Sequence, residues 1–173
     1  MNFKEQLVDS GRKLGEMVAK NVGRNPDYYL EILKLGLYED IPMSSRAGRV
    51  LNICTHRDNR LFQQNLDLVF KVLEEKCILH RSILKIFAEE NIQLNEEQEG
   101  ILLNNCFSWI ESKEQSVAVK IFSMDILSKF AQKEPDIIPE LLSVVETQIP
   151  VGSKGVKHKA KKLIRQYQKH RLR

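Results

Sequence analysis

The residues best suited to chemistry in this sequence are the basic side chains of its last twenty positions. Positions 154–173 hold nine Lys or Arg and no acid, because Glu146 is the last carboxylate. The other 18 of the 27 Lys and Arg share the preceding residues with all 23 acids, so an acidic body precedes a basic end. Ammonium and guanidinium groups on a helix can lie along phosphates and release counterions. The segment therefore predicts an anion-binding or partner-binding surface with four candidate residues: Lys157, Lys161, Lys162 and Arg165.

A structural interpretation of the same segment is a capping helix. Repeat arrays end in a unit with one polar outer face, and basic residues near a helix C-terminus interact favourably with the helix dipole. The two interpretations are compatible. An acidic protein surface and membrane headgroups are further anionic partners, but membrane docking is disfavoured because the apolar side of this helix holds no Trp or Phe. That apolar side consists of Val156, Ala160, Leu163, Ile164 and Tyr167.

A second basic group surrounds a predicted turn near position 58 and consists of Arg46, Arg49, Arg57 and Arg60. Arg46 and Arg49 share a helix side at a step of three, so they could form a local anion site. Asp58 and Asp67 lie close enough in sequence to neutralise the group. This proximity favours ion pairing within the fold.

The sequence contains no strong catalytic motif: it has no phosphate-binding glycine loop, no His-Glu-x-x-His and no Gly-x-Ser-x-Gly. Cys54 and His56 are close in sequence, but two positions apart on a helix they face different ways. Structural zinc takes four ligands, and none is paired with these two. The acid pairs diverge by about 100° on a helix, so they are typical of solvated faces rather than of acid–base partners. We therefore expect no cofactor, no metal and no enzymatic activity.

Length and composition indicate a soluble globular chain. Its 173 residues suit one compact domain, and its 42% hydrophobic and 29% charged residues are ordinary for such a domain. No apolar run suggests a signal peptide or a membrane span, so we expect a cytoplasmic protein. The three cysteines, Cys54, Cys77 and Cys106, are odd in number and far apart, which favours buried reduced thiols over a disulfide framework.

Apolar spacing predicts an all-α fold of about nine helices, because apolar residues recur at steps of three and four and no segment shows strand alternation. Residues 1–41 form N-terminal capping helices, one over residues 3–22 and a shorter one capped by Asn25. Residues 42–150 form three helical pairs, and residues 151–173 form the basic capping helix, entered at Ser153. The three pairs cover residues 43–54 with 62–73, residues 78–88 with 95–111, and residues 112–150.

The stretch from Ser112 to Pro150 carries the architectural prediction. Its first helix is apolar on more than one side, so it must be sandwiched between other helices. Its partner helix needs only one covering surface. The sequence also predicts capping boxes at Asn95 with Gln98 and at Ser112 with Gln115.

Superposition of the pairs reveals a repeat. Ala47, Leu84, Ser123 and Ala160 occupy equivalent stripe positions, 37, 39 and 37 residues apart, and a Val-Lys dipeptide precedes the last two at the same offset, at Val119-Lys120 and Val156-Lys157. With the segment Pro135-Asp136-Ile137-Ile138-Pro139-Glu140-Leu141-Leu142 between them, these residues resemble successive HEAT-like repeats. The resemblance is good over residues 112–170, looser over 42–111 and absent before 41. It implies a right-handed α-α superhelix and a role in binding proteins or, in one branch, DNA. We expect residues 1–173 to form a single α-solenoid domain.

Two enzyme groups that use helical folds fit the sequence poorly. A DNA-alkylation-repeat glycosylase would need an aromatic and acidic pocket, whereas the only tryptophan, Trp109, lies on an apolar stripe. Residues 42–46 match only part of the loop signature of the fumarase and adenylosuccinate lyase superfamily, because the Met-Pro and the Lys that should follow are absent.

The sequence leads to two hypotheses. The first is a non-enzymatic helical-repeat scaffold that binds a protein partner, an arrangement compatible with self-association. The alternative is a DNA- or RNA-binding module that contacts phosphates through the basic C-terminal helix and through Arg46 and Arg49. The first is preferred because the second helices of the pairs present a mostly neutral surface, which suits a peptide better than a polyanion. Its residues are Gln64, Lys71, Asn104, Ser108, Glu111, Ser143 and Thr147.

Overall fold

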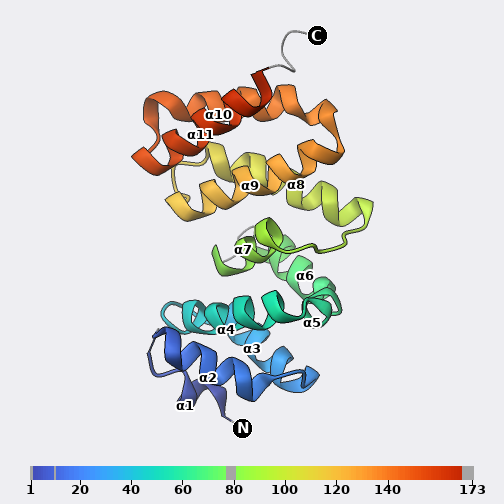
Figure 1. Ribbon diagram of the computed structural model, residues 1–173, viewed down its shortest axis with the longest axis vertical. Coiled ribbons are helices and arrows are strands. Elements are labelled where there is room, and N and C mark those ends of the chain that lie inside the picture. Colours follow the sequence, from blue (N-terminus) through green and yellow to red (C-terminus); the bar gives the residue numbers. More distant parts are fainter. Residues whose placement is uncertain (1, 10, 77–80, 169–173) are drawn as a thin grey trace. The chain divides into compact units, whose positions relative to one another are not determined.

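The computed structural model describes residues 2–9, 11–76 and 81–168 of the chain (Figure 1). These residues form eleven α-helices and one 3-10 helix, and no strand lies among them. The chain divides into two compact units, Met1–Gln93 and Leu94–Arg173, which we call unit 1 and unit 2.

Unit 1 contains seven of the described helices: α1 (Phe3–Gln6), α2 (Arg12–Val22), α3 (Pro26–Tyr38), α4 (Met43–Arg57), α5 (Arg60–Gln63), α6 (Leu66–Lys76) and α7 (Arg81–Glu89). Unit 2 contains α8 (Glu96–Glu111), α9 (Val117–Lys133), the 3-10 helix η1 (Pro135–Ile137), α10 (Ile138–Val151) and α11 (Lys154–Tyr167).

Two of the predicted helices are each divided in the structure. The predicted helix over residues 3–22 stops at Gln6, because Leu7 leaves the helical conformation with φ −86° and ψ 54°. It restarts at Arg12, after the extended backbone of Gly11 with φ −64° and ψ 143°. The predicted helix over residues 62–73 is split between α5 and α6. The described residues therefore hold eleven α-helices rather than about nine. The predicted helix over residues 78–88 is observed from Arg81 onward, and its first residues lie outside the described part of the chain.

The helix starts follow the predicted caps at three of four places. Asn25 accepts hydrogen bonds from the first amides of α3, Asn95 forms the predicted capping box of α8, and Ser153 caps α11. The predicted cap at Ser112 is wrong. Helix α9 begins five residues later, where the Ser116 hydroxyl accepts a bond from the Val119 amide at 3.3 Å.

In unit 1, α2, α4 and α7 pack in a row, and α3 packs on α4. Small residues allow close approach: a Cβ added at Gly48 of α4 would lie only 2.4 Å from the Ser82 side chain of α7. The Asn52 side-chain amide then bridges the two helices, donating to the Gly48 carbonyl at 2.7 Å and to the Ser82 carbonyl at 2.9 Å. The close contact between α4 and α7 therefore depends on glycine.

In unit 2, the four long helices form two layers, with α9 beside α11 and α8 beside α10. The most extensive contacts join α8 to α9 and α10 to α11. The prediction paired α9 with α10 instead, so the observed pairs are shifted by one helix along the chain. From Ala118 to Ala131 no residue of α9 is fully exposed, and α8, α10 and α11 all contact this helix. The predicted sandwiching of α9 is thus confirmed.

Candidate binding surface

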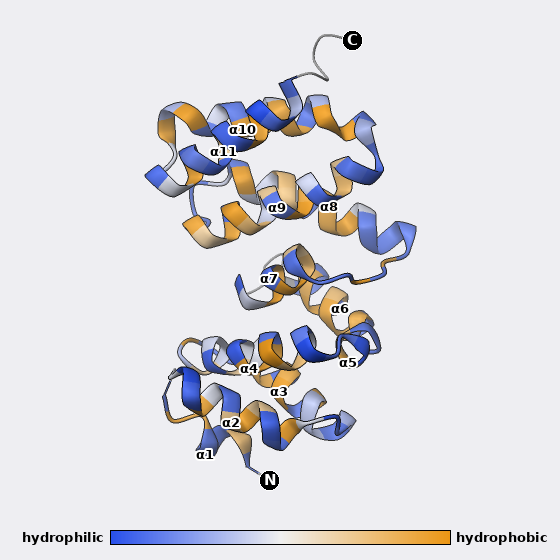
Figure 2. Ribbon diagram, viewed as in Figure 1, coloured by the Kyte–Doolittle hydropathy of each residue, from blue (hydrophilic) through white to orange (hydrophobic). Residues whose placement is uncertain are grey.

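Helix α11 separates its apolar and basic residues cleanly. Val156, Ala160, Leu163 and Tyr167 are buried at steps of four, three and four. The opposite side carries exposed residues at relative positions 0, 4, 7, 8 and 11, which share one face of a helix. These residues, which we call the α11 stripe, are Lys154, His158, Lys161, Lys162 and Arg165. The stripe runs for about 16 Å along the helix axis at 1.5 Å per residue, and its hydrophilic residues appear in blue in Figure 2.

The structure assigns Lys157 to a different role from that of the other three predicted residues. Its ammonium group donates to the Pro150 carbonyl at 3.2 Å, at the C-terminal end of α10. Lys159, on the other flank of α11, pairs with Asp125 of α9. In contrast, Lys161, Lys162 and Arg165 are exposed and have no hydrogen-bond or ion-pair partner among the described residues. These three side chains are therefore available to a ligand.

The repeated Val-Lys dipeptide has a structural explanation. Lys120 donates to the Ile110 carbonyl at 2.7 Å, at the C-terminal end of α8, and to the Gln148 side chain at 2.9 Å. Lys157 donates in the same way to the last turn of α10. In both repeats the lysine thus satisfies a carbonyl at the end of the preceding helix, where positive charge is favoured. Partial burial lowers the pKa of the Lys120 ammonium group.

Charge in unit 2 is segregated by layer. The layer of α8 and α10 contains six Glu and no Lys or Arg, whereas the layer of α9 and α11 contains nine Lys or Arg and a single acid, Asp125. Asp125 is itself paired with Lys159. The α11 stripe is therefore an exposed part of a layer with strong net positive charge, which can attract an anionic partner.

Unit 1 shows a similar segregation. Helices α2, α4 and α7, which pack in a row, carry eight Lys or Arg and two acids. Helices α3 and α6 carry three Lys and five acids. This pattern is hidden when charge is summed along the chain, because basic and acidic helices alternate. Summing charge over alternate helices could have revealed it.

The two arginines predicted as an anion site in unit 1 have different environments. Arg46 is half-buried, and its guanidinium group donates to the Leu7 carbonyl at 2.9 Å between α1 and α2. Arg49 is exposed, and its aliphatic stem covers Gly15 of α2, where an added Cβ would lie 3.0 Å from the Arg49 Cδ atom. The Arg46 guanidinium group therefore bonds to the segment between α1 and α2, whereas that of Arg49 is exposed and has no hydrogen-bond or ion-pair partner in the described part of the chain.

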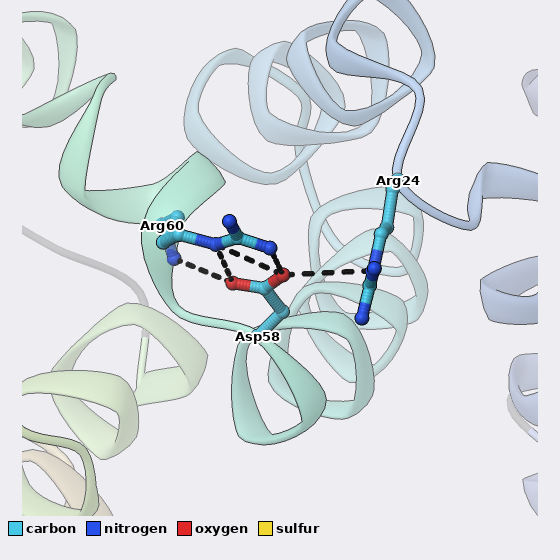
Figure 3. A network of polar contacts seen from close by, with 3 residues as sticks. All are labelled: Arg24, Asp58 and Arg60. Atoms are coloured by element: carbon cyan, nitrogen blue, oxygen red, sulfur yellow. Dashed lines mark hydrogen bonds and ion pairs between the residues drawn. The ribbon is translucent and has the colours of Figure 1, made fainter.

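The predicted ion pairing of Asp58 is confirmed (Figure 3). Arg60 binds both carboxylate oxygens of Asp58, with its Nη2 atom 2.6 Å from Oδ2 and its Nε atom 2.9 Å from Oδ1. Arg24, from the turn between α2 and α3, lies 3.7 Å from Oδ2 and was not foreseen. The hydrogen bonds from the Arg60 side chain, followed by that from its backbone amide, hold the pKa of the Asp58 carboxyl well below its ordinary value.

The described thiols, of Cys54 and Cys106, and the imidazole of His56 lie in structural settings. Cys54 and Cys106 are free and buried, and burial raises the pKa of their thiols to about 11 and about 12, so both are protonated at neutral pH. Cys77 lies outside the described residues. His56 is exposed and lies 3.0 Å from Glu90, whereas the buried Cys54 thiol lies 3.8 Å from the Ala19 carbonyl. Among the described residues, no three His, Cys, Asp or Glu side chains group as metal ligands would.

Two hollows in unit 1 offer little for catalysis. One, of about 260 Å³, lies at the ends of α2 and α4, where Arg24 and Asp58 are already paired. The other, of about 410 Å³, lies across α2, α4 and α7, and its ionisable residues include the pair of His56 with Glu90. Neither brings an activated nucleophile against a base. None of the described helices combines the length and the apolar character that crossing a membrane requires.

Comparison with known proteins identifies a family. The model of the HEAT repeat domain matches residues 5–167, which include every helix from α2 to α11. None of the curated proteins and none of the solved structures matches the chain. The family match and the helical structure confirm the predicted fold class, all-α and HEAT-like. The handedness of the superhelix and the single solenoid over residues 1–173 stay predictions.

Proposed function

Because this chain belongs to the HEAT repeat domain family, we propose that it is a non-enzymatic helical-repeat scaffold that binds a protein partner. The observation that carries the proposal is the charge difference between the two layers of unit 2. A basic layer with four exposed cations that have no partner among the described residues, Lys154, Lys161, Lys162 and Arg165, fits an acidic protein surface. Lys161, Lys162 and Arg165 are the residues of this layer that contact the partner.

The buried and paired residues support a scaffold rather than an enzyme. The thiols of Cys54 and Cys106 are protonated, and the Asp58 carboxylate is bound by Arg60. Burial also raises the pKa of the Tyr29 hydroxyl, which lies 2.7 Å from the Thr55 hydroxyl. Groups held in this way stabilise the fold and are poorly placed to exchange protons with a substrate.

Affinity capture tests the proposal with charge-matched variants. The nuclease-treated full chain serves as bait beside a Lys161→Glu/Arg165→Glu variant and a Lys34→Glu/Lys71→Glu control, whose lysines are exposed on α3 and α6. We expect a protein that the wild type and the control retain and that the first variant loses. Less of this protein should be retained as the salt concentration is raised above 0.1 M, because salt shortens the distance over which charges interact, which is about 10 Å at 0.1 M. Equal capture by both variants, or no selectively captured protein, contradicts the proposal.

Nucleic acid is the second candidate ligand, because the α11 stripe holds four Lys or Arg and a His at helical spacing with no acid between them. Fluorescence anisotropy with a 20-nucleotide single strand and a 20-base-pair duplex tests this candidate. Binding that falls steeply between about 50 and 200 mM salt, and that is lost in Lys161→Glu/Arg165→Glu, would support it. Absence of binding at the lower salt concentration would exclude it.

A further inference from the structure

An apolar surface adjoins the start of the α11 stripe. Val117 and Val151 are 46% and 76% exposed, and they are the large apolar side chains that unit 2 exposes among its described residues. Val117 opens α9, and Val151 ends α10 three residues before α11 begins. Both therefore lie at the end of unit 2 where α9 and α11 start, the left side of this unit in Figure 1.

The contacts of neighbouring residues place these helix ends together. Lys120 of α9 joins the end of α8 to the last turns of α10 through the Ile110 carbonyl and the Gln148 side chain. On α11, a Cβ added at Gly155 would lie 3.5 Å from Ile121 and 3.8 Å from Val117. We call Val117, Val151 and Gly155, with the half-buried Ile121, the valine patch.

Gly155 is not required for packing. The distances to an added Cβ are ordinary van der Waals contacts, so alanine would fit there. Alanine is also the better helix former. The absence of a side chain at Gly155 instead leaves Ile121 and Val117 uncovered on this side, beside Lys154, the first residue of the α11 stripe.

Resting on the proposed function, we propose that the valine patch and the α11 stripe together bind one acidic amphipathic segment of the protein partner. The apolar side chains of the segment pack on the valine patch, and its carboxylates lie along Lys161, Lys162 and Arg165. Charge complementarity selects an acidic segment, and the adjoining apolar surface selects a polypeptide over a nucleic-acid backbone, which has no aliphatic side chain to bury there.

Selection from a random dodecapeptide display library on the full chain tests this inference. We expect enriched peptides that combine at least two apolar residues with several Asp or Glu. The best peptide is then measured by fluorescence anisotropy against three variants. The patch variant is Val117→Ser/Val151→Ser, the stripe variant is Lys161→Glu/Arg165→Glu, and the control is Glu96→Gln/Glu97→Gln on the acidic layer.

Affinity should fall at least about tenfold in both the patch and the stripe variants and stay unchanged in the control, because burial of exposed aliphatic side chains and charge pairing both contribute. Circular dichroism checks that each variant keeps its helices. A peptide lost only in the stripe variant overturns the inference and leaves the proposed function intact. A peptide that tolerates the stripe variant contradicts both. Failure to enrich any acidic peptide overturns the inference. It is also overturned if single-stranded DNA binds more tightly than every selected peptide and binds the patch variant and the wild type equally well.

Discussion

Replacing Gly48 by alanine should destabilise unit 1, although alanine is the better helix former. The new Cβ would lie 2.4 Å from both the Cβ and the Oγ atoms of Ser82, so α4 and α7 must move apart. Overpacking of this kind costs about 1–3 kcal/mol. Strain in the two Asn52 hydrogen bonds adds about 1 kcal/mol, and the helix propensity of alanine returns about 1 kcal/mol. We therefore expect a net loss of about 1–3 kcal/mol in the free energy of unfolding.

Gly100→Ala is the matched control, because Gly100 also lies inside a helix but an added Cβ there meets no atom within 4 Å. This variant should be more stable than the wild type by about 0.5–1 kcal/mol. Urea unfolding followed by circular dichroism measures both changes. Ser82→Gly in the Gly48→Ala background should recover at least about 1 kcal/mol as coupling energy. A Gly48→Ala protein as stable as Gly100→Ala, or zero coupling with Ser82→Gly, would refute the reasoning.

Three further outcomes are expected. Ser116→Ala should lower the free energy of unfolding by about 1 kcal/mol through loss of the α9 cap, whereas Ser112→Ala should change it by less than about 0.5 kcal/mol; similar losses in urea unfolding would contradict the cap assignment. Lys120→Met should cost about 1–2 kcal/mol, because it leaves a carbonyl and an amide oxygen unpaired in a partly buried site, and the more exposed Lys157→Met should cost less; the reverse order would contradict the shared role. The pKa of Asp58 is lowered on folding, so its contribution to stability is present at neutral pH and is lost as pH falls below about 4. In Asp58→Asn, the free energy of unfolding should therefore fall less steeply as pH drops below about 4 than it does in the wild type. An unchanged pH dependence would contradict the pairing.

The fold was predictable because helix formation depends on local patterns. Apolar spacing and caps such as Asn25 and Asn95 identified most helices and several of their starts. The divisions after Gln6 and Gln63 were not predictable from periodicity, because the apolar stripe continues across each break. The observed pairs of packed helices in unit 2 also differ from the predicted pairs by a shift of one helix along the chain. Sequence adjacency does not show which face of α9 packs on α8 and which on α10.

The candidate surface was only partly predictable. Helical spacing correctly placed Lys161, Lys162 and Arg165 away from the apolar side of α11. It could not separate them from Lys157, because the bond of Lys157 to a carbonyl of α10 depends on where the preceding helix ends. The long-range contact of Arg46 with Leu7, 39 residues away, was likewise invisible in the sequence.

The distribution of charge supports the proposal that α11 binds a partner as well as closing the array of helices. A cap alone would place excess positive charge on α11 only. Yet α2, α4 and α7 in unit 1 also carry far more Lys and Arg than acids, and α8 and α10 in unit 2 carry acids alone. Successive helices of a packed repeat lie in alternate layers. If basic and acidic helices alternate along the chain, one layer therefore becomes basic and the other acidic. Charge in unit 2 thus follows its two layers, and in unit 1 positive charge gathers on the packed row of α2, α4 and α7, a distribution that suits electrostatic recognition of an anionic partner.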